Sequence, residues 1–284
     1  MLPRQGVTPE LARFIVDTKW DDLPGTARHE AKRALLNFFA VVIAGCRTQP
    51  VELALRTLGE FSGGRQATIV GRPERIDPLS AAFLNAAGAN VFDYCDTHLP
   101  TVVHPTSPLA PALLALSEIR KVTGPELLLA FALGFEIECR VGGAISPGHY
   151  PKGWHITSTC GVFGAAAGAA KLLGLDAERT VWALGSASTQ SAGLCECLGW
   201  PAKSVSVGNA ARNGLFSALL AEKGFAGPPE PIAGAQGFLA AMGEPPNWAA
   251  LLVGLGLGEE IGDESRYGTS VGLVHDRLCD ILRD

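Results

Sequence analysis

The chain has 284 residues, of which 47% are hydrophobic and only 18% are charged, so it can bury a large core, and disorder over most of its length is excluded. Its 23 Lys and Arg against 28 Asp and Glu give a net charge of -5 without a basic run, which excludes nucleic acid as a partner and leaves an anionic small substrate open. Seven cysteines without a CxxC pair indicate reduced thiols and not a disulfide framework.

The sequence predicts no membrane contact. Its longest apolar stretches, residues 34–46 and 127–135, are shorter than the roughly 18 residues that a membrane span requires. The first segment carries Glu10, Arg13 and Asp17 where a signal peptide would need its apolar core. We therefore expect a cytoplasmic protein.

Capping side chains and first-turn prolines recur before apolar-periodic runs, and they predict where helices start. Such starts occur at Thr8-Pro9, Asp77-Pro78, Thr123-Gly124-Pro125 and Asp176. The predicted helices cover residues 8–19, 25–45, 50–61, 78–92, 107–121, 124–144, 156–173, 176–190, 205–223 and 234–242. Only residues 66–71 are typical of a strand, because they are short, β-branched and bounded by glycine. The sequence therefore predicts an all-α fold with at most a minor strand.

One predicted helix is unusually rich in small residues. From Gly161 to Gly174, glycines and alanines recur at four-residue spacing, which lets two helix backbones approach closely. Glycine inside a helix costs about 0.5–1 kcal/mol relative to alanine, so several of them in one helix need a packing reason. We expect this helix to be the centre of a large multi-helix domain over residues 1–245.

The composition changes toward the end of the sequence. Residues 254–262 mix glycine with acidic residues, and one short amphipathic helix is predicted around Val271 to Leu282. We expect residues 246–284 to form a divergent, exposed C-terminal tail.

The densest polar cluster lies between two predicted helices, a position where sites are commonly built. Its side chains belong to Asp93, Asp96, Thr97, His98, Thr101 and His104. Their carboxylates, imidazoles and hydroxyls could supply general acids and bases. The alternative is that Asp96 and Thr97 only satisfy turn amides and that the histidines are solvated.

Two further polar segments, residues 149–155 and 200–209, each lead into a helix. Free amides and the positive end of the helix dipole favour a bound anion at such a place. With His155 and Lys203, these two helix starts would suit a carboxylate. The alternatives are a His155 bonded to the backbone and a solvated Lys203.

Motifs for metals and nucleotides are missing from the sequence. The pair Cys195-Glu-Cys197 is too closely spaced for a two-cysteine zinc knuckle. The glycines form neither GxGxxG nor GxxxxGK, and GxSxG is absent as well. We therefore expect no metal, no nucleotide cofactor and no hydrolase triad.

Taken in order, the three polar segments resemble the MmgE/PrpD family, which includes 2-methylcitrate dehydratase and cis-aconitate decarboxylase. The resemblance rests on FDYCDTHLPTVVHP from Phe92, PKGWHITSTCGVFGAAAGAAKLLGL from Pro151 and PAKSVSVGNAARNGLFSALLAEKGFAGP from Pro201, and it extends over residues 8–243. It implies a helical domain with a smaller α/β lid, no metal or organic cofactor, and a homodimer.

By motif position, the resemblance places Asp93, Thr97, His104, His155 and Lys203 among the active-site residues of the family. The family's lid adds a lysine and a tyrosine. This sequence has no lysine after Lys223, and its one later tyrosine is Tyr267. Either a separate lid-bearing subunit completes the site, or the chain is a truncated member.

The resemblance implies a cofactor-independent lyase of the 2-methylcitrate dehydratase type, acting on a small di- or tricarboxylate. Proton removal beside a carboxylate builds negative charge, which Lys203 and a protonated histidine could stabilise. Asp93 or His155 would be the base and His104 the acid, and decarboxylation or epimerisation would use the same parts. The alternative is a dimeric, non-catalytic scaffold, or one part of a split enzyme, that binds carboxylates weakly.

Overall fold

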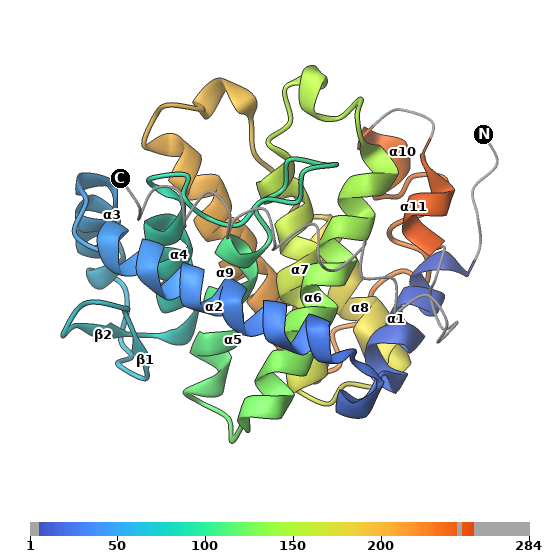
Figure 1. The fold of residues 1–284 in the computed structure, drawn as a ribbon, viewed down its shortest axis with the longest axis horizontal. Coiled ribbons are helices and arrows are strands. Elements are labelled where there is room, and N and C mark those ends of the chain that lie inside the picture. The colour runs from blue at the N-terminus through green and yellow to red at the C-terminus, as the bar shows by residue number, and fades with distance from the viewer. Residues whose placement is uncertain (1–5, 243–245, 253–284) are drawn as a thin grey trace.

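The computed structural model describes residues 6–242 and 246–252 (Figure 1). In these residues eleven α-helices and one short hairpin confirm the all-α prediction. The helices are α1 (Val7–Asp17), α2 (Gly25–Gly45), α3 (Gln49–Gly59), α4 (Pro78–Asn90), α5 (Thr106–Ser117), α6 (Gly124–Ile145), α7 (Ile156–Leu172), α8 (Ala177–Ser188), α9 (Ala202–Glu222), α10 (Phe238–Met242) and α11 (Trp248–Leu252). Short 3-10 turns lie at Trp20–Asp22, Tyr150–Lys152 and Cys195–Cys197.

Three of the predicted helix starts are capped as expected. The Asp77 carboxylate accepts the N–H of Ser80 at 3.0 Å, and the Asp176 carboxylate accepts the N–H of Arg179 at 2.8 Å. Thr123 forms a capping box in which the Glu126 carboxylate returns to the Thr123 N–H at 2.7 Å. These caps satisfy helix amides that lack an intrahelical partner.

The fourth predicted start, at Thr8-Pro9, is wrong by one residue, because α1 begins at Val7. Thr8 is fully buried, and its N–H donates to the Glu230 carboxylate at 2.9 Å. The Thr8 hydroxyl donates to the same oxygen. A side chain 222 residues further along the chain therefore supplies the acceptor at the start of α1.

The predicted strand is shorter than expected and has a partner that the sequence did not indicate. Strand β1 (Ala67–Thr68) pairs antiparallel with β2 (Arg75–Ile76). The predicted helix at 234–242 also begins later, at Phe238, since Gly234 and Gly237 lie in a turn in which the Gly237 N–H donates to the Gly234 oxygen.

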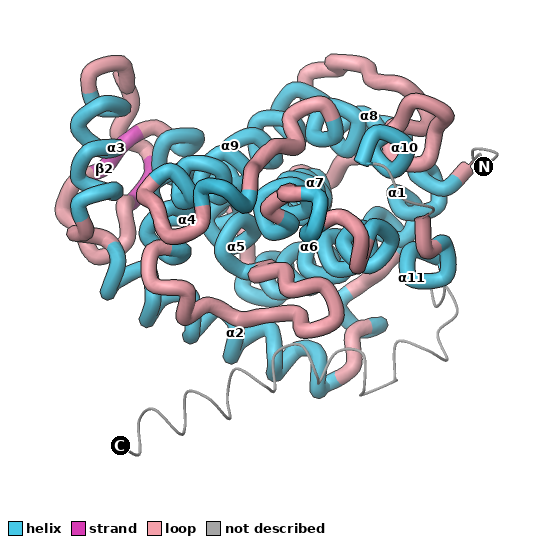
Figure 2. Tube along the Cα trace, turned by 90° about the horizontal axis from the view of Figure 1, so that it is seen from above, coloured by secondary structure: helices cyan, strands magenta, loops and turns pink. Residues whose placement is uncertain are grey.

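The central position predicted for the small-residue helix is confirmed. Helix α7 is buried continuously from Ile156 to Ala170 and contacts α5, α6, α8 and α9 (Figure 2). A side chain at Gly161 would place its Cβ 2.4 Å from the ring of Pro108, and one at Gly164 would place it 3.0 Å from the Gly134 oxygen. Neighbouring elements thus occupy the volume that side chains would need.

The same packing brings three helix starts to one end of the bundle. The Ser158 hydroxyl, in the first turn of α7, donates to that of Ser206, near the start of α9, at 2.7 Å. The His104 N–H, just before α5, donates to the Thr157 hydroxyl at 3.1 Å. The predicted polar segments therefore meet across the N-terminal ends of α5, α7 and α9.

Part of the predicted tail lies against the helical domain. The Asn247 N–H donates to the Ala144 oxygen at 2.8 Å, and Leu251 in α11 is fully buried next to α6. The helix predicted around Val271 to Leu282 lies outside the described residues.

Among the described residues, no single helix is long and apolar enough to cross a membrane. Helices α2 and α3 meet those criteria of length and composition only as a pair, and the pair is bent by 84°.

The packing of α7 predicts a large effect for a one-carbon substitution. In Gly164→Ala the new Cβ would lie 2.5 Å from the Glu138 carboxylate and 3.0 Å from the Gly134 oxygen, so we expect a loss of about 1–3 kcal/mol in unfolding free energy, measured by urea denaturation. Gly59→Ala is the matched control, because nothing lies within 4 Å of its Cβ. Equal stability of the two variants would contradict close packing at Gly164.

Candidate active site

An ion pair between Lys203 and Asp93 joins two of the predicted polar segments. The Lys203 ammonium, in the first turn of α9, donates to the Asp93 carboxylate. Only 10% of the Lys203 side chain is exposed, against 55% for Asp93. Asp93 has φ 56°, a left-handed conformation that Asp adopts more readily than most residues. Lys203 is therefore not the solvated lysine of the alternative interpretation.

His155 is the residue just before α7 and is linked to Lys203 through two hydroxyls. The Ser206 hydroxyl donates to the Lys203 main-chain oxygen at 2.8 Å, and the Ser158 hydroxyl donates to Ser206. With the hydroxyl hydrogens in these directions, the ring is the donor in the contact of 2.7 Å between His155 Nδ1 and the Ser158 oxygen. In this arrangement the hydrogen of neutral His155 is on Nδ1, and its lone pair is on Nε2.

A loop from another part of the chain fixes the backbone of His155. The His155 N–H donates to the Gly193 oxygen at 3.1 Å. Gly193 has φ +139°, and a Cβ there would lie 2.8 Å from the Cβ of Ser158. A residue without a side chain is required at this close approach.

His104 is anchored in the loop that precedes α5. Its Nδ1 lies 3.0 Å from the Asp96 main-chain oxygen and 3.1 Å from the Thr97 hydroxyl. Its N–H is bonded to Thr157 in the first turn of α7. The structure therefore places His104 and Thr97 in direct contact and joins them to the start of the central helix.

Burial keeps the imidazole of His155 neutral. Its pKa is lowered from 6.5 to about 4, first by desolvation and then by the positive charges of Lys203 and His104, while Asp93 acts in the opposite sense. Three of the other predicted residues are therefore close enough to His155 to act on it electrostatically.

Two other histidines of the polar segments have structural contacts. His98 Nδ1 lies 2.7 Å from the Thr101 hydroxyl, within a turn closed by the His98 N–H and the Val103 oxygen. His149 is buried, lies 2.8 Å from the Thr159 hydroxyl and stacks on Trp154. Burial lowers the pKa of each of these two imidazoles to about 4.

The expected helix-terminal anion sites are only partly available. At the start of α9, the N–H groups of Lys203 and Ser204 donate to the oxygens of Trp200 and Pro201, at 3.0 and 3.1 Å. These amides are used within a tight turn and do not point freely at a ligand. The positive charge at this end of α9 is therefore that of the Lys203 side chain.

Reasoning from the sequence missed the hydroxyls that connect the site. Ser158 follows His155 by three residues, and Ser206 follows Lys203 by three. This spacing places each serine one helical turn after its functional neighbour. It was the one signal in the sequence that could have pointed to them.

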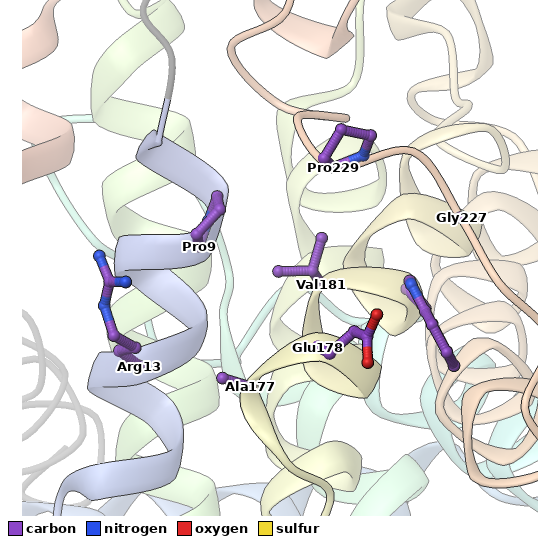
Figure 3. Close-up of a pocket in the computed structure, with 8 residues that line it drawn as sticks. Pro9, Arg13, Ala177, Glu178, Val181, Gly227 and Pro229 are labelled. Carbon is purple, nitrogen blue, oxygen red and sulfur yellow. The ribbon is translucent and has the colours of Figure 1, made fainter.

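A separate cavity of about 380 Å³ lies between α1 and α8 (Figure 3). Apolar side chains such as Pro9, Val181 and Pro229 line it, and none of the five predicted site residues does. Within residues 6–242 and 246–252, no group of three or more His, Cys, Asp or Glu is arranged to hold a metal ion.

Comparisons with known proteins agree with the resemblance in the sequence. A family model, the MmgE/PrpD N-terminal domain, matches residues 9–251. A cis-aconitate decarboxylase-like protein of Aspergillus oryzae is 34% identical over 234 residues, 79% of this chain and 48% of that protein. The cis-aconitate decarboxylases of Aspergillus terreus and Homo sapiens are 34% and 31% identical, over 78% of this chain and 47% of theirs. The chain thus spans about half the length of these curated relatives.

The neutral state of His155 predicts an acid-sensitive stability. Because the folded state favours the neutral ring, the unfolded chain binds the proton more tightly. The contribution of His155 to stability is therefore full above pH 6.5, falls as the pH decreases and stops falling below about pH 4. The unfolding free energy decreases between pH 7 and pH 5, and in His155→Gln we expect this decrease to be smaller by about 2 kcal/mol.

The measurement is urea denaturation at each pH, and His29→Gln is the control, because His29 lies exposed on α2. The control should retain the pH dependence of the unmodified chain. If His155→Gln retains it as well, His155 takes up its proton equally well in the folded and unfolded states.

Proposed function

The chain belongs to the MmgE/PrpD family, and we propose that it supplies the helical-domain side of the active site of a lyase that acts on a small di- or tricarboxylate. The observation that carries this proposal is the mostly buried Lys203 ammonium, paired with Asp93 and linked to His155 at the common end of α7 and α9. It is a cation held by its hydrogen bond to Asp93, and a carboxylate can approach it from the exposed side of Asp93.

In the proposed reaction, Lys203 stabilises negative charge that develops beside a substrate carboxylate. Such a contact acts mainly in the transition state, and its removal typically costs about 3–4 kcal/mol of barrier. Asp93 holds the ammonium in the ligand-free state and would turn to solvent when the substrate carboxylate takes its place. This exchange keeps Lys203 paired throughout and avoids an isolated buried charge.

The two imidazoles are suited to move protons at Nε2. In both rings Nδ1 is occupied, by the Ser158 hydroxyl in His155 and by the Asp96 oxygen in His104. In a decarboxylation the bond to the leaving carboxylate breaks, CO2 departs, and the electron pair stays on carbon until a protonated Nε2 delivers its proton. In a dehydration one Nε2 takes the proton beside the carboxylate, and the other protonates the departing hydroxyl.

The names of the relatives make cis-aconitate the first substrate to test. This differs from the 2-methylcitrate that the sequence resemblance placed first, although both are tricarboxylates. We propose further that a lid-bearing segment, on this polypeptide or on a separate subunit, completes the site. Without it, water reaches Lys203 from the side of Asp93 and weakens its hold on a carboxylate.

Carboxylate binding by the described site should depend on Lys203. We expect cis-aconitate or citrate to bind with Kd in the millimolar range, corresponding to about 4 kcal/mol, measured by isothermal titration calorimetry. Lys203→Met should abolish this binding. Lys223→Met is the matched control, because Lys223 lies at the far end of the same helix and pairs with Glu222.

Product analysis by NMR separates the reactions. Decarboxylation of cis-aconitate yields a five-carbon unsaturated diacid, whereas a dehydratase forms an unsaturated tricarboxylate from a citrate-like acid. Turnover that Lys203→Met abolishes and Lys223→Met retains would support the lyase. Binding without turnover of either acid would favour the scaffold alternative, and equal binding by both variants would place the carboxylate elsewhere.

We also propose that the chain forms a homodimer through α2. Leu36, Phe39 and Ile43 lie three and four residues apart on this helix and are 72%, 37% and 55% exposed. This spacing puts them on one face, and Figure 1 shows α2 crossing the outside of the bundle. A continuous apolar face of this kind is typical of an interface.

The double variant Leu36→Lys/Ile43→Lys should be monomeric by light scattering at a concentration where the unmodified chain is dimeric, because two buried charges per subunit would oppose association. Leu53→Lys changes a similarly exposed leucine on α3 and should stay dimeric. A dimer that survives the double variant would rule out α2 as its interface.

A further inference from the structure

Asp96 contacts the ring of His104 through its main chain and has no exposed surface. Its main-chain oxygen is 3.0 Å from His104 Nδ1. Its carboxylate accepts the hydroxyl of Thr106 at 2.6 Å and the Thr106 N–H at 3.3 Å. Asp96 therefore holds the ring of His104 and also Thr106, the first residue of α5.

The contact between Asp96 and His104 determines where the ring carries its hydrogen. A main-chain carbonyl only accepts hydrogen bonds. His104 Nδ1 must therefore be the donor, and Nε2 is the nitrogen that is left to gain or lose a proton. The Thr97 hydroxyl, 3.1 Å from Nδ1, supports the same N–H as a second acceptor.

A second acid, Glu138 on α6, lies in the core near Asp96. It is fully buried, and neither of its carboxylate oxygens has a hydrogen-bond partner among the described residues. The carboxyl occupies the space that Gly161 and Gly164 leave, because a Cβ at either glycine would lie within 3.2 Å of one of its oxygens. A buried carboxyl without a partner is strongly favoured in its neutral form.

The two carboxyls therefore differ in charge. Burial and the nearby negative charge of Asp96 raise the pKa of Glu138 well above its usual range. Burial raises the pKa of Asp96 to about 6, while the bond from Thr106 and the charge of His104 oppose the rise. Near neutral pH the pair holds one negative charge, and it lies on Asp96.

We propose that Asp96 is a positioning residue for His104: its main-chain oxygen fixes the hydrogen on Nδ1, and its buried carboxylate balances the positive charge that the ring acquires when Nε2 takes up a proton. The link to turnover rests on the proposed function, in which His104 moves a proton at Nε2. The hydrogen position and the charge balance are properties of the protein without substrate, so they are measurable whether or not that function is correct.

Few other titratable groups face this pair. Besides His104 and Glu138, the thiols of Cys95 and Cys139 interact electrostatically with Asp96. Burial raises the pKa of Cys95 to about 12 and also raises that of Cys139 well above its usual value, so both stay neutral. His155 faces His104 from the start of α7 and is neutral above about pH 4. The ion pair of Asp93 and Lys203 also lies within electrostatic range, because both groups interact with Cys95 and with His155.

The experiment is nitrogen NMR on the full chain with 15N-labelled histidine. The chain has six histidines, and the His104 signals are assigned by their loss in His104→Gln. In the unmodified protein at pH 8, Nδ1 should give the signal of an N–H nitrogen and Nε2 that of a bare nitrogen. In Asp96→Asn, which keeps the shape and the acceptor for the Thr106 N–H, the ratio of doubly to singly protonated rings at pH 7, where Asp96 of the unmodified protein is mostly ionised, should fall severalfold.

Glu138→Gln is the matched control, because it replaces a neutral acid by a neutral amide of the same shape. It should leave the ratio for His104 unchanged. A hydrogen on Nε2 in the unmodified protein, an unchanged ratio in Asp96→Asn, or an equal fall in Glu138→Gln would each overturn the proposal.

The unmodified protein alone decides the hydrogen position, so the proposal stays testable if Asp96→Asn does not fold. Turnover of cis-aconitate is measured separately. Lack of turnover together with the expected NMR result would reject the proposed function and leave the role of Asp96 intact. The expected turnover together with a hydrogen on Nε2 would support the proposed function and reject the role of Asp96.

Discussion

Close contact between helix backbones around α7 is the constraint on which the rest of the molecule depends. Glycine is less favourable than alanine inside a helix, because it loses more conformational freedom on folding. At Gly161 and Gly164, however, the missing side chains let α5 and α6 approach until Pro108 and the Gly134 oxygen fill the space. The approach also sets how far the starts of α5, α7 and α9 are from one another. The distances between the polar helix starts therefore depend on close helix contacts one or two turns further along α7.

Local chemistry was sufficient to predict most helices. A capping oxygen acts on amides two or three residues away, so Asp77, Thr123 and Asp176 could be interpreted without knowledge of the fold. At Thr8 this reasoning failed by one residue, because the acceptor is Glu230 and comes from a distant segment. Strand β2 was missed for the same kind of reason, since a two-residue strand has no pattern of its own apart from its partner.

For the candidate site, the sequence indicated residue types, and the structure added their connections. Asp93, Thr97, His104, His155 and Lys203 were chosen by motif resemblance, and their catalytic roles remain predictions. The chain of hydroxyls from His155 to Lys203 depends on the register of α7 against α9, which no local pattern contains. Hydrogen-bond direction then assigns the ring hydrogens, so that the geometry yields protonation states as well as positions.

The contact between Thr8 and Glu230 has a consequence for synthesis on the ribosome. Helix α1 is synthesised before its partner, because the carboxylate that completes its first turn follows 222 residues later. At about 5–20 residues per second this delay is roughly 10–45 s. During that time the apolar side of α1, with Leu11 and Ile15, has no finished core to enter. Until residue 230 is synthesised, the nascent chain therefore presents the apolar face of an amphipathic helix, which is the kind of surface that chaperones bind.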